Sequence, residues 1–327
     1  MLSTDKIRVK CIAMGLLKVQ RSKTAICLVL MGGFVGMCDG NPPPVSTPVP
    51  AAQSVFQTQT MIKPTTPTID NSSLSKQTAA PSPEISPPDI PPLAQCSLGV
   101  GLRRETVPIL LKYRETPGMV MSASLQIAET VFPELKDWIR AIGAPSLSEL
   151  EKKAKRAREN NIPYEALAYG IETLPTTPTE EWNDLIGSTQ KARELSDQYG
   201  KSLMMGPGLR LMDENMDAYQ PMGARSDIWV FQTQMIQKNY PPGEEYRAEV
   251  EQVVKQIKSG NPDIQVWAQI TLPPGREPNA QEWLAYRESI VDLVDGTFIG
   301  VYSWGRADSR ILLNTIDEIF ASACGLE

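Results

Sequence analysis

Hydrophobic residues in the C-terminal two thirds of the chain fall into short runs bounded by turn-forming residues. Seven of these runs predict β-strands, at 107–113, 119–124, 165–171, 202–208, 228–234, 264–270 and 298–304. Between the later runs, apolar residues recur at spacings of three and four, as along 246–257, and this pattern predicts helices. Strands that alternate with helices in this order are typical of parallel β/α units.

Side chains that commonly cap helices precede four of the helical patterns. These are Ser146, which can form a capping box with Glu149; Thr179, ahead of a helix that reaches Tyr199; Asn279, paired with Glu282; and Asp308. We therefore expect helices to begin at these four positions.

A closed barrel is the fold that best suits this pattern. The alternating part is about 230 residues long, and neither Gly206-Pro-Gly208 nor Gly99-Val-Gly101 meets the requirements of a nucleotide-binding loop. The sequence predicts an α/β fold, a (β/α)8-like TIM barrel over residues 96–327. Only seven strands are identified, so one strand is hidden or the barrel is irregular.

The N-terminus has the pattern of an export signal. Residues 1–23 contain six basic residues and one acid, a net charge of +5, and an apolar run follows at 25–37. Thirteen apolar residues are too few to span a bilayer and suit a signal peptide. We predict a signal peptide over 1–37, with Met14 as an alternative start. Cys38 ends a bacterial lipobox-like VGMC, so lipidation of Cys38, plain secretion and an uncleaved anchor are all open.

Residues 38–95 have the composition of a linker. Thirteen prolines and many Ser and Thr residues lie between 41 and 93, with one aromatic residue, Phe56. Such a segment buries too little apolar surface to offset its ordering entropy. We predict a Pro/Ser/Thr-rich disordered tether between a membrane-proximal cysteine and the folded part, in a protein that is secreted or anchored in a bacterial cell envelope.

Cysteine parity fits an oxidising compartment. Cleavage before Cys38 would remove Cys11 and Cys27, and acylation would occupy Cys38, which leaves Cys96 and Cys324 as a pair at the two ends of the folded part. In a closed barrel the first and last elements are neighbours, so a disulfide between them is plausible; two unrelated buried thiols are the alternative.

Composition excludes several kinds of chemistry. The chain has no histidine, so it has no Ser-His-Asp nucleophile and no His-ligated metal. No Asp-x-Asp or cluster of acids lies at the strand ends, and we expect neither a metal nor another cofactor. Residues 38–327 carry a net charge of −11 and no basic stripe, which argues against nucleic acid as a partner.

The strand ends carry the candidate site, because a TIM barrel builds its site at the C-terminal ends of its strands. Glu172 follows one strand directly, with helix capping or an ion pair as its structural alternative. The other candidates for the rim are amides and aromatic residues: Tyr169, Gln232, Gln234, Trp267, Gln269, Tyr302 and Trp304. Amides can bind hydroxyl groups and indole faces can stack on sugars, so we expect a carbohydrate ligand; the tryptophans could instead fill the barrel.

Several segments resemble the glycoside-hydrolase-like TIM barrels of bacterial secreted proteins. They are YEALAYGIETLPTTPTEEW (164–182), KSLMMGPGLRL, DIWVFQTQ, IQVWAQI and DGTFIGVYSW, within residues 160–305. In that family the strand that corresponds to residues 165–172 often reads Y-D-I-E-H-W. Tyr169, Ile171 and Glu172 match this motif, whereas Gly170 and Thr173 replace its first acid and its histidine.

The resemblance implies two functions. The first is a tethered barrel that binds cell-envelope glycan, with catalysis left open. The second is an active glycoside hydrolase in which Glu172 is the general acid and Asp213 or Glu214 the second carboxylate. Two carboxyls in one cleft would favour the second function.

Overall fold

The computed structural model describes residues 96–173, 175–272, 277–301 and 309–325. The predicted signal peptide and linker, Cys38 included, lie outside the described residues, as do Tyr302 and Trp304. Within the described part of the chain, no helix combines the length and the hydropathy that crossing a membrane requires.

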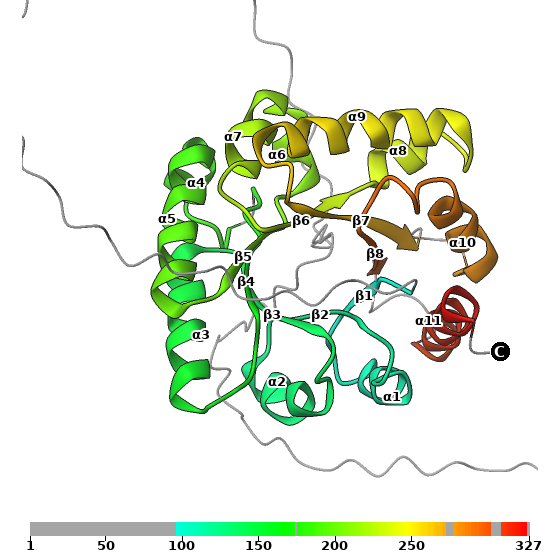
Figure 1. Ribbon diagram of the computed structural model, residues 1–327, viewed down its shortest axis with the longest axis horizontal. Helices are drawn as coiled ribbons and strands as arrows, with labels where there is room; N and C mark the ends of the chain where they lie inside the picture. The colour runs from blue at the N-terminus through cyan, green and yellow to red at the C-terminus, as the bar shows by residue number, and fades with distance from the viewer. Residues whose placement is uncertain (1–95, 174, 273–276, 302–308, 326–327) are drawn as a thin grey trace, which may run out of the picture.

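Eight parallel strands form a closed barrel (Figure 1), which confirms the predicted TIM barrel. Each strand pairs with the next, and β8 pairs with β1. The strands are β1 (Leu98–Gly101), β2 (Gly118–Ser122), β3 (Ile139–Ala144), β4 (Ala166–Tyr169), β5 (Ser202–Met205), β6 (Ile228–Gln232), β7 (Gln265–Leu272) and β8 (Gly296–Val301).

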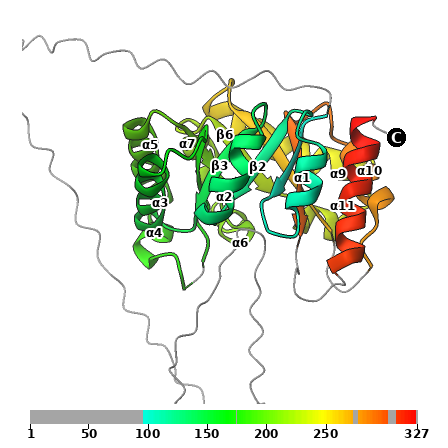
Figure 2. The same ribbon diagram turned by 90° about the horizontal axis from the view of Figure 1, so that it is seen from below.

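The helices form a ring outside the strands, as the views in Figures 1 and 2 show. The α-helices are α1 (Val107–Lys112), α2 (Leu125–Val131), α3 (Leu147–Glu159), α4 (Thr179–Asn183), α5 (Leu185–Tyr199), α6 (Leu209–Asp213), α7 (Tyr219–Gly223), α8 (Gln234–Asn239), α9 (Glu244–Gly260), α10 (Ala280–Glu288) and α11 (Ser309–Cys324). Two short 3₁₀ helices are η1 (Phe132–Glu134) and η2 (Met216–Ala218).

Six of the seven predicted strands coincide with β2 and with β4 to β8. The prediction of a strand at 107–113 is wrong: this segment is α1, where Pro108 occupies the first turn and Ile109 and Leu110 are buried. Two strands, β1 and β3, were not predicted. β1 is hidden because it has four residues, of which two are glycine. A Cβ on Gly99 would lie 2.5 Å from the Phe298 ring, so the tight interior packing requires glycine there.

The capping predictions are confirmed at two positions. Ser146 accepts a hydrogen bond from the Glu149 amide, and Asn279 accepts one from the Glu282 amide. A helix, α4, does begin at Thr179, but Thr179 does not cap it, and the single helix expected to reach Tyr199 is wrong: a second helix begins after Asp184, whose side chain accepts from the Gly187 amide. Asp308 lies outside the described residues.

Large side chains fill the barrel interior beneath its C-terminal mouth. Ten buried residues form the interior cluster: Met119, Ile139, Ala141, Ala166, Ala168, Met204, Ile228, Val230, Trp267 and Phe298. A Cβ on Gly296 would lie 2.5 Å from the Trp267 ring, just as one on Gly99 would meet Phe298. Glycines thus make room for two large rings, which seal the barrel beneath its C-terminal mouth.

Three acidic residues, each at the N-terminal end of a strand, form hydrogen bonds with the preceding strand. Each acid lies directly before β4, β6 or β8. Its main-chain amide donates to the carbonyl of one residue on the preceding strand, and its carboxylate accepts the main-chain amide of that strand residue. The pairs are Glu165 with Arg140, Asp227 with Leu203 and Asp295 with Val266, with amide-to-carboxylate distances of 2.9, 2.7 and 2.8 Å. We call this arrangement the carboxylate clamp.

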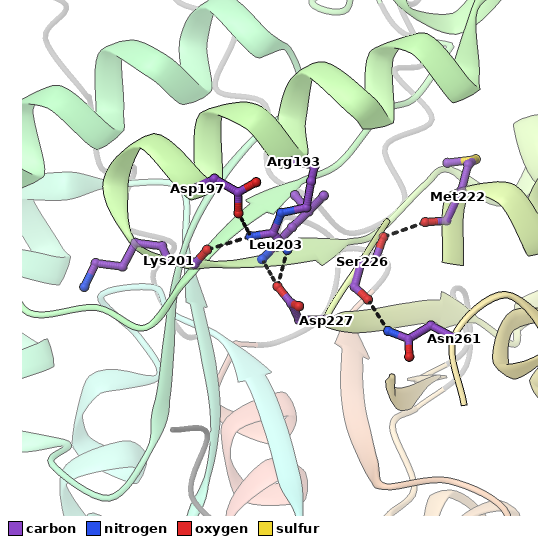
Figure 3. Close-up of polar contacts among 8 residues, drawn as sticks. All are labelled: Arg193, Asp197, Lys201, Leu203, Met222, Ser226, Asp227 and Asn261. Carbon is purple, nitrogen blue, oxygen red and sulfur yellow. Dashed lines mark hydrogen bonds and ion pairs between the residues drawn. The ribbon is translucent and has the colours of Figure 1, made fainter. Parts of the chain in front are cut away.

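A basic side chain completes each clamp. Arg193 of α5 bonds the Asp227 carboxylate, which also accepts the Leu203 amide (Figure 3). The Arg140 side chain pairs with Glu165, and Lys258 lies 3.1 Å from Asp295. Because each carboxylate has both a charge partner and an amide donor, its partial burial is compensated.

A disulfide connects the two ends of the barrel. Cys96, two residues before β1, is bonded to Cys324 at the end of α11, with a Cα–Cα distance of 4.8 Å. The bond therefore holds the last helix against the first strand.

Candidate active site

The two-residue alternation of the strands aims three polar side chains at the barrel mouth. Ala168 on β4, Val230 on β6 and Trp267 on β7 all belong to the interior cluster. Residues two or four positions further along share their side of the strand. This places Glu172, Gln232 and Gln269 at the C-terminal end of the barrel, above the sealed interior.

These three polar side chains line one cavity. Its walls within the described part of the chain are Met121, Ala168, Glu172, Met204, Gly206, Val230, Gln232 and Gln269. Its volume is about 20 Å³, which is room for about one water-sized group. Only the reacting end of a ligand can enter such a space.

Burial makes Glu172 an unusual carboxyl group. Desolvation raises its pKa from 4.5 to about 7, and no opposing charge on a described residue lowers it. Gly208 packs closely on this side chain, since a Cβ there would lie 2.9 Å from the Glu172 Cγ. The Gly208 amide also donates to the Ile171 carbonyl at 2.8 Å. Glu172 is thus held in place and can gain or lose a proton near neutral pH.

The structure separates the other predicted carboxylates from this cavity. Neither Asp213 nor Glu214 is among the residues of its wall. Glu214 is exposed and forms an ion pair with Arg210 at 3.0 Å. Burial and the Glu214 charge raise the pKa of Asp213 at the end of α6. Among the described residues, Glu172 is the one acid of the cavity, so the expected carboxylate pair is not formed there.

Two aromatic candidates do not fit a substrate-binding role in this structure. Tyr169 lies on the outer side of β4, and its hydroxyl donates to the buried Glu181 at 2.7 Å. Trp267 is fully buried in the interior cluster. Gln234 begins α8 and donates to Gln232 at 3.5 Å. Tyr302 and Trp304 fall outside the described residues.

Sequence reasoning missed the apolar wall of the cavity and the glycine against Glu172. Met121 lies two residues after Met119 on β2, and Gly206 lies two residues after Met204 on β5, so strand alternation could have placed both at the mouth. The contact of Gly208 with Glu172 joins two separate loops, and only the three-dimensional packing shows it.

A larger cavity, of about 250 Å³, lies at the opposite end of the barrel between β8 and α10. Asp295, its acidic member, is already bound by the Val266 amide and Lys258. Sites of TIM-barrel enzymes lie at the other end, where Glu172 is. We therefore place the candidate site at the mouth.

The raised pKa of Glu172 predicts a pH-dependent stability. Because the folded-state value of about 7 exceeds the ordinary 4.5, this carboxyl favours folding below pH 4.5, and the contribution is lost as pH rises through 7. From pH 5 to 8, urea denaturation should show wild type losing up to about 3 kcal/mol relative to Glu172→Gln. If wild type and Glu172→Gln differed in free energy of unfolding by the same amount at pH 5 and at pH 8, the pKa of Glu172 would not be raised by burial.

Comparison with known proteins identifies no family: no protein-family pattern and no curated protein matches the sequence. Solved structures do match the fold. A 3-keto-L-gulonate-6-phosphate decarboxylase from Vibrio cholerae covers 69% of this chain and 97% of its own, at 8% identity and a TM-score of 0.42. An orotidine 5'-monophosphate decarboxylase from Sulfolobus solfataricus covers 69% of this chain and 98% of its own, at 8% identity and a TM-score of 0.40. A 2,3-dimethylmalate lyase covers 70% of this chain and 83% of its own, at 7% identity and a TM-score of 0.40.

These comparisons correct the predicted family and function. The matched structures named above are decarboxylases and a lyase, and no glycoside hydrolase is among them. The resemblance to glycoside-hydrolase-like barrels is therefore wrong, and with it the glycan-binding barrel and the active glycoside hydrolase. The single carboxyl in the described cavity wall also argues against the active glycoside hydrolase, which needs two. At such low similarity the matches assign no activity to this chain.

Proposed function

We propose that this protein is an enzyme that moves a proton on a small polar substrate, with Glu172 as the general acid–base. One observation carries the proposal: a partly buried carboxyl group at the mouth of a TIM barrel has no charge partner among the described residues, and its pKa is raised to about 7. Such a group is a matched proton acceptor and donor near neutral pH.

The surroundings of Glu172 support a catalytic role over a structural one. The buried or partly buried carboxylates with a structural role have hydrogen-bond donors: each clamp carboxylate has an amide donor and a basic partner, and Glu181 accepts from Tyr169 and the Leu147 amide. The Glu172 carboxyl forms no hydrogen bond or ion pair with any group that the structure describes, and burial is the cause of its shifted pKa. Since an uncompensated buried carboxyl destabilises the fold, a functional reason accounts for it better.

Proton exchange with solvent tests this proposal without knowledge of the natural substrate. The full chain is incubated in D₂O with small ketones, carboxamides, hydroxy acids and amines, and loss of each C–H signal is followed by proton NMR. We expect exchange in at least one of these classes, with a rate that rises with pH through a midpoint near 7. Absence of exchange from all of them, or an unchanged rate in Glu172→Gln, would overturn the proposal.

We further propose that the barrel is displayed outside the cytoplasm on a tether that begins at Cys38. The basic and apolar segments within 1–37 and the lipobox-like VGMC support export. The Cys96–Cys324 disulfide supports an oxidising compartment.

Lipid labelling in a bacterial host tests this anchoring. We expect wild type to incorporate a fatty-acid analogue and to fractionate with membranes, and Cys38→Ser to do neither. Labelling that persists in Cys38→Ser, or an unlabelled wild type in the cytoplasmic fraction, would contradict it.

A further inference from the structure

The side chain of Gln269 has an amide group that is buried but unpartnered. Gln269 is 7% exposed, and its Nε2 has no hydrogen-bond partner in the described structure. Its main chain is fixed, since its carbonyl accepts from the amide and the hydroxyl of Thr233 at 3.1 and 3.0 Å. A buried donor left unpaired costs about 1–3 kcal/mol, so this amide is placed to bind something in the cavity that it lines.

A second amide lies directly beside it. Gln232 on β6 is paired in register with Gln269 on β7, and adjacent strands are about 4.8 Å apart. The Gln232 Oε1 accepts from Gln234 at 3.5 Å. This leaves the Gln232 amide nitrogen to act as a donor, and within the described chain it donates to no group.

Glycines leave room for these amides and for a ligand. A Cβ on Gly300 of β8 would lie 2.9 Å from both Cγ and Nε2 of Gln269, so glycine permits the observed position of that side chain. At Gly206 a Cβ would find no atom closer than 4.0 Å. Gly206 therefore borders open space inside the cavity.

The charges of the cavity select the kind of group that binds. Its described wall contains no lysine or arginine, and its single ionisable group is the acid Glu172. Two neutral amide donors suit an uncharged oxygen acceptor, whereas a phosphate or carboxylate would face an acid with no compensating cation among the described residues of the wall. A carbonyl oxygen, which accepts two hydrogen bonds and is small, meets both requirements.

We infer that Gln269 and Gln232 bind the carbonyl oxygen of a small uncharged ketone, aldehyde or carboxamide, whose adjacent C–H faces Glu172. This inference rests on the proposed function and names its substrate class. The Glu172 carboxylate takes the proton from the carbon next to the carbonyl, and the C–H electron pair becomes the C=C bond. The carbonyl π pair moves to oxygen, where the amide N–H groups stabilise the charge. The proton on Glu172 exchanges with solvent, and the solvent-derived proton then returns from Glu172 to the carbon, so no oxidant or reductant is needed.

Matched carbonyl and alcohol pairs test the inference by binding alone. Hydroxyacetone is compared with propane-1,2-diol, and acetone with propan-2-ol, with acetamide as the carboxamide; binding is measured by saturation-transfer NMR. The full chain carries Glu172→Gln so that no turnover interferes. We expect each ketone to bind about 10-fold more tightly than its alcohol, the value of roughly one hydrogen bond.

Two variants locate that preference. Gln269→Leu removes the donors at similar volume, so the ratio of ketone to alcohol affinity should fall to about 1, while the melting temperature stays equal or rises because a buried unpaired amide is removed. Gly206→Ala adds a methyl group to the cavity and should weaken binding of every ligand. Gln252→Leu, at an exposed position of α9, is the matched control and should change neither.

Three results of the binding experiment would overturn the inference: no binding of any carbonyl compound, equal binding of ketone and alcohol, or a preference that survives Gln269→Leu. Carbonyl binding without proton exchange in wild type would refute the proposed function but not this assignment. Proton exchange that does not depend on Gln269 would refute this assignment alone.

Discussion

Glu172→Gln is expected to lower the rate of substrate proton exchange by about 10³-fold, because a positioned general acid–base contributes about 10²–10⁴-fold. Gln has nearly the same shape, so the packing against Gly208 is retained. It does not titrate, so the rise in rate with a midpoint near pH 7 should vanish together with the activity. The fold should survive, since the variant removes a carboxyl whose ionisation is opposed by burial.

Two further variants test whether the loss of activity is specific to the Glu172 carboxyl. Glu180→Gln changes an exposed acid on α4, eight residues later, and should leave both rate and pH profile unchanged. Glu172→Ala opens space where the carboxylate was, and added formate should restore part of the rate by supplying one. Full activity in Glu172→Gln, or equal losses in Glu180→Gln, would show that Glu172 is not the acid–base group.

Asp227→Ala is expected to lower the free energy of unfolding by about 3 kcal/mol, measured by urea denaturation at pH 7. The change removes the acceptor of the Leu203 amide and leaves Arg193 without its main partner (Figure 3). Breaking a buried ion pair from one side costs about 3–5 kcal/mol, and we take the lower end because the two side chains are 19% and 27% exposed.

The isosteric variant separates the two contributions of Asp227. Asp227→Asn keeps an oxygen that can accept the Leu203 amide but removes the charge, so it should lose about half as much stability. Glu159→Ala breaks an exposed ion pair with Lys155 and should cost less than about 1 kcal/mol. A cost for Asp227→Ala as small as that for Glu159→Ala would mean that the clamp does not stabilise the barrel.

Strand prediction succeeded where a run was long or strongly apolar and failed where glycine or proline carried the information. β6 and β7 contain continuous apolar runs because both of their faces are buried. β1 was missed because two of its four residues are glycine, and one of them, Gly99, is required by the packing of Phe298, which lies 199 positions away along the chain. The 107–113 segment was misassigned because its apolar run has strand length, while Pro108 in the first turn favours a helix.

The candidate site was only partly predictable for a similar reason. Glu172, Gln232 and Gln269 were proposed from their positions at strand ends, and alternation brings all three to one cavity. Asp213 and Glu214 also follow a strand, but α6 carries them out of the cavity wall. The carboxylate clamps were not predicted, because the amide that such an acid binds is known only once the neighbouring strand and its register are known.

The sequence by itself determined the alternation of strands and helices, the barrel class, and the absence of histidine chemistry, because these depend on local periodicity and residue type. Tertiary structure alone decided that, among the described residues, Glu172 is partly buried without a charge partner and that the Gln269 Nε2 in the same cavity has no hydrogen-bond partner. Burial and pairing depend on which distant residues meet, and a pKa follows from that environment rather than from the residue type.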